Sequence, residues 1–168
     1  MKFISFLHNK EAKYGVVNNK LITDLTGKVL KAKTLKELIQ KKGISDAKKY
    51  AIDNPGNINL EEIEYLPLIP NPGKIICVGL NYSEHVKETN RTVEENPVIF
   101  HRFPESQTAH QQPIQRPIAS QSLDYEGEMA VIMSEAGKHI KPGDALKHIV
   151  GYSCYNESTI REWQRHTR

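Results

Sequence analysis

The 168-residue sequence predicts an α+β, mostly β protein, in which a small N-terminal α+β domain precedes a second, strand-rich domain. Short stretches of alternating apolar and polar residues recur along the chain, as is typical of half-buried strands. Helical spacing of apolar residues is confined to a few short segments. A proline-rich connection at residues 66–73 separates two parts of different character.

The first third of the chain carries the clearest strand signals. Alternation predicts short antiparallel strands at residues 2–7, 14–17 and 20–25. Because Asn18-Asn19 lies between the last two and asparagine tolerates turn conformations, we expect a hairpin there.

Two helices are expected after this hairpin. Thr34 followed by Glu37 fits a capping box, and the stripe of Leu35, Leu38 and Ile39 predicts a helix that ends near Gly43. Ser45 is expected to begin another short helix, which residues 54–56 stop.

The domain boundary is predicted at the proline-rich connection. Pro67, Pro70 and Pro72 fix φ and disfavour helix in the residues before them, so this stretch should be stiff and extended. We therefore assign residues 1–70 to the small domain and residues 71–168 to the second domain. Its expected elements are a buried strand at 74–79, a helix from Ser83, strands at 97–103, 125–133 and 150–156, and a helix turn at 144–149.

Composition excludes several classes of function. The 23 basic residues exceed the 20 acidic ones too slightly to indicate a nucleic-acid partner, and the lysines of residues 28–42 fit the solvated face of a helix. Nothing near the N-terminus resembles a signal peptide, and no apolar run is long enough for a membrane span. We expect a cytoplasmic protein, with Cys77 and Cys154 as buried, reduced thiols.

Paired carboxylates are the first chemical signal. On a strand, Glu126 and Glu128 point to one face together with Ala130 and Ile132. Two such carboxylates repel each other unless a cation or a shared proton intervenes, and oxygen ligands suit Mg²⁺, Mn²⁺ or Ca²⁺. The alternative is that this strand end lies in solvent.

Two further segments carry candidate groups. His85 and Glu88 share a helix face, where a carboxylate would raise the basicity of the imidazole as a water-activating base needs. Glu157, at the end of an apolar strand, could be a third carboxylate ligand. The alternatives are a surface His/Glu pair and an acidic residue favoured by a helix dipole.

Four ordered motifs together resemble the fumarylacetoacetate hydrolase family, whose members include fumarylacetoacetase, acylpyruvase and 2-hydroxyhepta-2,4-diene-1,7-dioate isomerase. They are residues 74–82 with His85, residues 97–100, residues 124–131, and Gly151-Tyr152 leading to Asn156 and Arg161. The resemblance implies a mixed, mostly β roll for the second domain, preceded by the small domain that many members carry.

The resemblance also implies roles for single residues. It assigns Glu126, Glu128 and Glu157 to the metal, His85 with Glu88 to water activation, and Arg102 with Tyr82 to the substrate. Arg102 is the natural donor to a substrate carboxylate because a guanidinium binds a carboxylate bidentately. Most relatives have aspartate in place of Glu157, and the extra methylene is expected to alter coordination.

The implied function is that of a metal-dependent enzyme acting on a small 2-oxo or 2-hydroxydienoic acid. The metal, Mg²⁺ or else Mn²⁺ or Ca²⁺, would stabilise an enolate during C–C hydrolysis or isomerisation. The resemblance implies a homodimer when the domain is complete, and the chain is expected to be truncated at its C-terminus. The alternative is a catalytically silent remnant that acts as a protein-interaction module.

Overall fold

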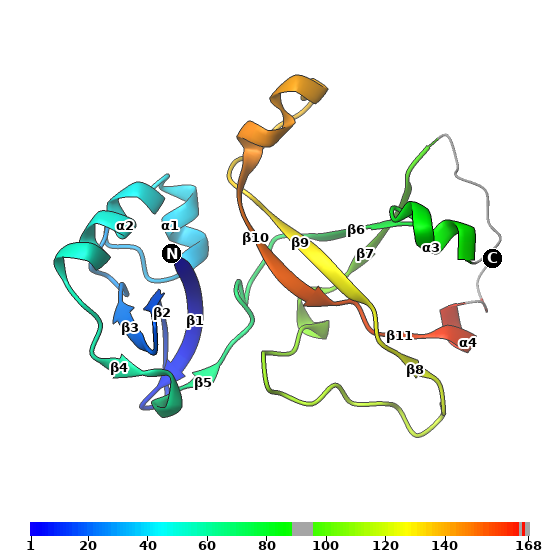
Figure 1. Ribbon diagram of the computed structural model, residues 1–168, viewed down its shortest axis with the longest axis horizontal. Helices are drawn as coiled ribbons and strands as arrows, with labels where there is room; N and C mark the ends of the chain where they lie inside the picture. The colour runs from blue at the N-terminus through cyan, green and yellow to red at the C-terminus, as the bar shows by residue number, and fades with distance from the viewer. Residues whose placement is uncertain (89–95, 165, 167–168) are drawn as a thin grey trace.

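The structure, a computed structural model, describes residues 1–88, 96–164 and 166, without the side chains of His85, Lys87 and Glu88. Strands predominate over short helices, which confirms the predicted α+β, mostly β class. In Figure 1 the N-terminal elements lie together at one end of the molecule, and the strands of residues 75–160 lie at the other.

A five-stranded antiparallel sheet organises the N-terminal part, in the order β4-β3-β2-β1-β5. Its strands are β1 (Lys2–His8), β2 (Glu11–Asn18), β3 (Leu21–Asp24), β4 (Ile58–Asn59) and β5 (Glu64–Tyr65). Asn18 pairs with Leu21, and Asn19 takes a positive φ of 54° between them, so the predicted hairpin is confirmed. The two-residue strands β4 and β5 were not predicted, because segments so short carry no alternation.

Helices α1 (Leu35–Gln40) and α2 (Ile44–Asp53) follow the hairpin. The Thr34 side chain accepts a hydrogen bond from the Glu37 backbone N–H, as the predicted capping box requires. The Glu37 carboxylate accepts from the Lys33 N–H instead of the Thr34 N–H, so the N-cap is confirmed and the reciprocal half of the box is not. Helix α2 begins at Ile44 with Gly43 as its N-cap, slightly before the predicted start at Ser45. A Cβ at Gly43 would lie 2.7 Å from Leu38 Cδ1, so a larger residue at this junction would require the Leu38 side chain to shift.

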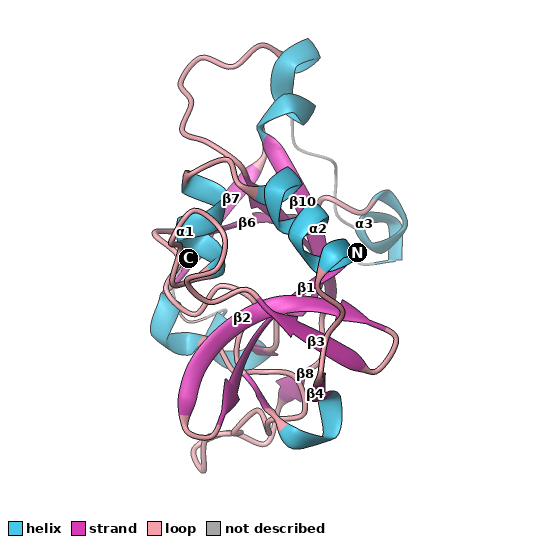
Figure 2. Cartoon of the chain, turned by 90° about the vertical axis from the view of Figure 1, so that its left-hand side faces the viewer, coloured by secondary structure: helices cyan, strands magenta, loops and turns pink. Residues whose placement is uncertain are grey.

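Both faces of the N-terminal sheet are covered, as Figure 2 shows for the side of α1 and α2. The larger cluster consists of Tyr14, Val16, Leu25, Val29, Ala32, Leu35, Leu38, Ile39 and Ala47. On the opposite face, Ile4, Phe6 and Ile22 pack against residues of the 58–65 segment, which includes the short 3₁₀ helix η1 (Leu60–Glu62). Apart from Val86, the buried apolar side chains of the described residues all lie between Ile4 and Ala47.

The remaining strands form three two-stranded antiparallel sheets. Strand β6 (Ile75–Gly79) pairs with β7 (Val98–Arg102), β9 (Gly127–Met133) with β10 (Ile149–Asn156), and β8 (Leu123–Asp124) with β11 (Thr159–Ile160). The helices of this part are α3 (Ser83–Glu88), η2 (Pro104–Ser106), η3 (Pro142–His148) and α4 (Arg161–Gln164). The predicted helix turn at 144–149 is thus a 3₁₀ helix that starts earlier, at Pro142.

Two burial predictions in this part are wrong. Strand β6 was expected to be buried, yet Ile76 is 62% exposed and Val78 is 46% exposed. Cys154 is exposed and Cys77 half-buried, although both are free thiols as expected. Cys154 pairs with Met129 on the outer face of the β9–β10 hairpin, which no described layer covers.

The two parts of the chain contact each other directly. Lys42 Nζ lies 2.7 Å from Glu135 Oε2, and the Ser5 hydroxyl holds the connection between the parts by donating to the Leu68 carbonyl at 2.7 Å. Ile132 and Val150 pack against the larger N-terminal cluster. The position of a domain boundary between residues 70 and 71 stays a prediction. Among the described residues, no helix has the length and apolar character that crossing a lipid bilayer requires.

Candidate active site

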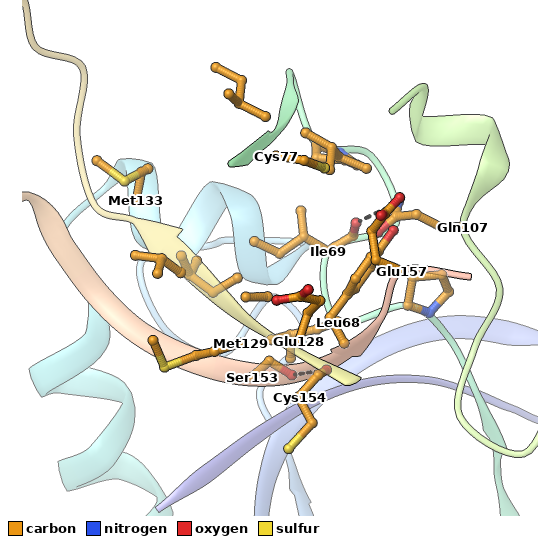
Figure 3. Close-up of a pocket in the computed structure, with 18 of the residues that line it drawn as sticks. Leu68, Ile69, Cys77, Gln107, Glu128, Met129, Met133, Ser153, Cys154 and Glu157 are labelled. Atoms are coloured by element: carbon orange, nitrogen blue, oxygen red, sulfur yellow. Dashed lines mark hydrogen bonds between the residues drawn. The ribbon is translucent and has the colours of Figure 1, made fainter. Parts of the chain in front are cut away.

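The β9–β10 hairpin presents two different faces. Along β9, side chains alternate between half-buried (Glu128, Ala130, Ile132) and exposed (Met129, Val131, Met133). This confirms the alternation predicted for the strand. Figure 3 shows Glu128 directed into the space below β6, whereas Cys154 points to the other side of the hairpin. Glu126 lies just before β9, in the short segment that follows β8.

One backbone hydrogen bond joins Glu126 to Glu157, and a second bond ties the Glu126 backbone to the side chain of Asn156. The Glu157 N–H donates to the Glu126 carbonyl at 2.8 Å, and the Glu126 N–H donates to Asn156 Oδ1 at 3.1 Å. The hairpin register explains this, because Gly127 pairs with Asn156 and their outer neighbours are therefore adjacent. Two motifs about thirty residues apart in the chain thus meet at one edge, as their shared assignment to a metal would require.

Each of the three glutamates has a hydrogen-bond donor from a different element. Arg102, at the end of β7, donates to Glu157. The Tyr82 hydroxyl, in the loop before α3, bonds to Glu128.

Arg161, the first residue of α4, supplies the third donor. Its Nη2 lies 3.1 Å from Glu126 Oε2, and its Nε lies 2.6 Å from Asp124 Oδ2. The neighbouring Trp163 on the same helix is 51% exposed.

The carboxylates also influence one another electrostatically. Burial raises the pKa of Glu157, the Arg102 hydrogen bond and charge oppose this, and the charges of Glu126 and Glu128 raise it further. The hydrogen bond to Glu128 raises the pKa of Tyr82. These groups therefore form one electrostatic unit, in which adding a positive charge would relieve repulsion.

The chemistry of this oxygen donor set fits a hard divalent cation. Glu126 Oε1 is buried and has no hydrogen-bond partner among the described residues, which is the state expected of an oxygen available to a ligand. Within residues 1–88, 96–164 and 166, no three His, Cys, Asp or Glu side chains are already gathered to hold a metal ion. A carboxylate has two oxygens, so a glutamate can keep its donor on one oxygen and offer the other to a cation. Among the described residues, Arg102 occupies one Glu157 oxygen, and Arg161 leaves Glu126 Oε1 free.

The residues predicted for substrate binding and for water activation are placed less completely. Tyr82 is 46% exposed and its hydroxyl is engaged by Glu128, while Arg102 faces Glu157. His85 and Glu88 belong to α3, but their side chains lie outside the described part of the chain. The structure therefore brings together the three glutamates, Tyr82 and Arg102, and their predicted roles stay predictions.

Sequence reasoning gave no role to Asp124 and did not foresee its pairing with Arg161. The pairing depends on the β8–β11 ladder, in which Thr159 lies opposite Asp124. Strands of two residues leave no periodic pattern, so no signal in the sequence could have predicted it.

A broad cavity of about 2170 Å³ runs along these residues. Glu126, Glu128 and Glu157 line it from the hairpin side, Cys77 from β6, and Leu68 from the connection. Its volume exceeds the roughly 300–1,000 Å³ of pockets for small ligands. Glu126, Glu128 and Glu157 form what we call the carboxylate edge. This edge is one wall of a wide groove that is open to small molecules.

Comparison with known proteins gives a consistent picture. A family model described as "Fumarylacetoacetate (FAA) hydrolase C-terminal" matches residues 74–168. The chain is 40% identical over 117 residues to the Xenopus laevis protein "Oxaloacetate tautomerase fahd2, mitochondrial", covering 69% of this chain and 37% of the relative. The chain thus spans little more than a third of the length of that relative.

Two solved structures share the fold. The fumarylacetoacetate hydrolase from Exiguobacterium antarcticum matches with a TM-score of 0.81 and 32% identity, covering 98% of this chain and 58% of its own. The maleylpyruvate hydrolase from Sphingobium sp. SYK-6, solved with manganese(II) and pyruvate, matches with a TM-score of 0.77 and 21% identity, covering 96% and 60%. The second likeness, at this identity, concerns the fold alone.

Proposed function

Since the chain belongs to the fumarylacetoacetate hydrolase family, we propose that it forms part of a divalent-metal-dependent enzyme that acts on small 2-oxo or 2-hydroxydienoic acids. The observation that carries the proposal is the meeting of Glu126, Glu128 and Glu157 at one edge, with the buried Glu126 Oε1 left without a partner among the described residues. Repelling carboxylates at a groove wall are stabilised when a cation binds between them.

In this proposal the three glutamates hold the ion, and Mg²⁺ or Mn²⁺ suits their oxygen ligands. When bound, the ion would supply Lewis-acid stabilisation of the negative charge that develops on a 2-oxo acid as it becomes an enolate. The solved relative with manganese(II) and pyruvate supports both the kind of metal and a 2-oxo acid ligand.

Enolate formation is a step that tautomerisation, isomerisation and C–C hydrolysis can share. The Xenopus relative is named a tautomerase, and the solved relatives include hydrolases. For the hydrolytic outcome, His85 held by Glu88 would take a proton from water. For tautomerisation no water needs to be activated: a proton moves between a carbon and an oxygen of the 2-oxo acid, and the three glutamates would position that acid through the cation that they hold.

The other expectations remain proposals as well. They are a homodimer, a cytoplasmic location and, as the alternative function, a silent interaction module. The Xenopus relative is named a mitochondrial protein.

Metal titration of the glutamate variants tests the proposal. We expect the chain to bind Mn²⁺ and Glu126→Gln to lose that binding, because the substitution removes a charged ligand while keeping its size. Glu105→Gln, at an exposed carboxylate outside the edge, is the matched control and should bind as the wild type does. Undiminished Mn²⁺ affinity in Glu126→Gln would contradict the proposal, as would wild-type protein that binds no Mn²⁺.

Activity assays then distinguish the reaction. Metal-supplemented protein is offered oxaloacetate, with enol-to-keto conversion followed by ultraviolet absorbance, and acetylpyruvate or fumarylpyruvate, with cleavage followed in the same way. Turnover of oxaloacetate alone would assign a tautomerase, and cleavage of an acylpyruvate would assign a hydrolase.

A further inference from the structure

We propose that Arg102 is a positioning residue and does not contact the substrate. It acts as a clamp that holds the turn between β10 and β11 and so orients Glu157 toward Glu126 and Glu128 at the carboxylate edge. The inference rests on the proposed function, because it concerns how one of the proposed metal ligands is held. It reassigns a residue that the sequence resemblance had linked to the substrate carboxylate.

Among the described residues, the polar contacts of the Arg102 side chain fall on the turn and on the first residue of β11. Its Nε donates to the Glu157 carboxylate, Nη2 forms an ion pair with the same carboxylate, and Nη2 donates to the Ser158 carbonyl at 3.2 Å and to Thr159 Oγ1 at 3.3 Å. The three acceptors belong to consecutive residues, two of which, Glu157 and Thr159, are buried. A planar guanidinium that bridges consecutive residues fixes their relative orientation, which a single point charge cannot do.

The clamp joins parts of the fold that share no sheet. Arg102 ends β7, whose partner is β6, whereas the clamped turn follows β10, whose partner is β9. Thr159, immediately after the turn, opens β11 and pairs with Asp124 of β8. The clamp therefore connects the β6–β7 sheet to the edge at which the glutamates meet.

The clamp also influences the position of Glu126, through Arg161 of α4. Arg161 directly follows β11 and lies 3.1 Å from Glu126 Oε2. Fixing the turn thus also fixes the residue that holds Glu126, so one guanidinium orients two of the three proposed ligands.

A substrate contact by Arg102 would be costly in this arrangement. If the guanidinium turned to an incoming carboxylate, the Glu157 carboxylate, 8% exposed, would lose its charged partner. A turned guanidinium would also leave the Ser158 carbonyl and Thr159 Oγ1, which a bound cation does not replace, so the present contacts favour a fixed clamp over a residue that moves to the substrate.

Three variants of the 168-residue chain test the clamp. Arg102→Lys keeps the charge and removes the planar fork, and Thr159→Val removes one acceptor without touching a carboxylate. Arg116→Lys is the matched control, at an exposed position away from the edge. The readouts are the Mn²⁺ dissociation constant, the amide hydrogen exchange of residues 157–160, and the pyruvate affinity of Mn²⁺-loaded protein.

We expect Arg102→Lys to weaken Mn²⁺ binding by about 10- to 100-fold, the usual effect of losing a partner that orients a metal ligand. Exchange at residues 157–160 should accelerate, and Thr159→Val should shift both readouts in the same direction by less. Arg116→Lys should change neither. Pyruvate affinity at saturating Mn²⁺ should stay near the wild-type value in Arg102→Lys.

Wild-type Mn²⁺ affinity and wild-type exchange in Arg102→Lys would overturn the clamp, and a loss confined to pyruvate affinity would restore the substrate role. If Arg102→Lys fails to fold, Thr159→Val decides by the same criteria. If the wild type binds no Mn²⁺, the proposed metal function fails, and the clamp is judged by exchange alone: faster exchange supports it and unchanged exchange overturns it.

Discussion

The N-terminal sheet and the β9–β10 hairpin are built from similar alternating strands, yet they differ sharply in burial. Phe6 on β1 and Ile22 on β3 are completely buried, whereas Met129 on β9 is 60% exposed and Tyr152 on β10 is 57% exposed. The N-terminal sheet has helices on one face and the 58–65 segment on the other. Among the described residues, only the inner face of the hairpin has a packing partner, where Ile132 and Val150 meet the N-terminal cluster.

This difference shows that alternation predicts which side chains share a face, and that a second layer decides whether the face becomes a core. Isolated two-stranded sheets are marginal in water, so the outer apolar faces of β6–β7 and β9–β10 contribute little to stability as they stand. Exposed apolar surface of this kind is typical of sites that bind further protein surface. We therefore expect the free energy of unfolding to come mainly from residues 1–70.

The largest expected effect comes from removing a core side chain. Phe6→Ala should lower the free energy of unfolding by about 3–5 kcal/mol, because it leaves a cavity in a fully covered face. The matched change on the outer hairpin face, Met129→Ala, should stay within about 0.5 kcal/mol. Urea unfolding followed by far-ultraviolet circular dichroism measures both. Equal losses of unfolding free energy in the two variants would contradict the conclusion that the outer hairpin face contributes little to stability.

Alkaline pH should destabilise the N-terminal core through the ionisation of Tyr14. Burial raises the pKa of Tyr14 to about 12, with Asp24 and Glu37 adding to the shift. A pKa raised on folding means that stability is fully present below the unfolded value, near 10.0, and is lost as pH rises through the folded value.

Between these two pKa values the loss from this group approaches about 1.4 kcal/mol per pH unit. Tyr14→Phe should remove this component and leave the alkaline titration of the lysines. Urea unfolding of both proteins at a series of pH values is the measurement. Parallel pH profiles for the two proteins would show that Tyr14 is not held neutral by the core.

The smallest effect is expected at the ion pair that links the two regions. Lys42 lowers the pKa of Glu135, and Glu135 in turn raises that of Lys42. The carboxylate contribution is present above the usual pKa of glutamate and is lost as pH falls through its lowered value. Lys42→Gln should therefore slightly lower the melting temperature near neutral pH and have no effect in acid or at high salt. A large change would mean that the contact between the regions depends on this pair.

Local chemistry accounts for most of what the sequence predicted. The Thr34 cap, the Asn18-Asn19 turn and the alternation along β9 each depend on residues close together in the chain. The association of Glu126 with Glu157 followed from a resemblance between ordered motifs, and the hairpin register now gives its structural cause.

What escaped prediction depends on packing between distant elements. The bond between Arg102 and Glu157 requires two separate sheets to meet, and no periodicity reports that. The exposure of Ile76 was missed for the same reason, since a strand with apolar residues on both faces has the same pattern whether or not a layer covers it.

The position of Trp163 has a spectroscopic consequence. It is the sole tryptophan of the chain, and it lies half-exposed on α4, two residues after the arginine that holds Glu126. Its fluorescence emission therefore reports the environment of the carboxylate edge and not that of the N-terminal core. An unfolding curve recorded by tryptophan emission and one recorded by circular dichroism would follow different regions, so the separation of their midpoints would measure how far the two regions unfold independently.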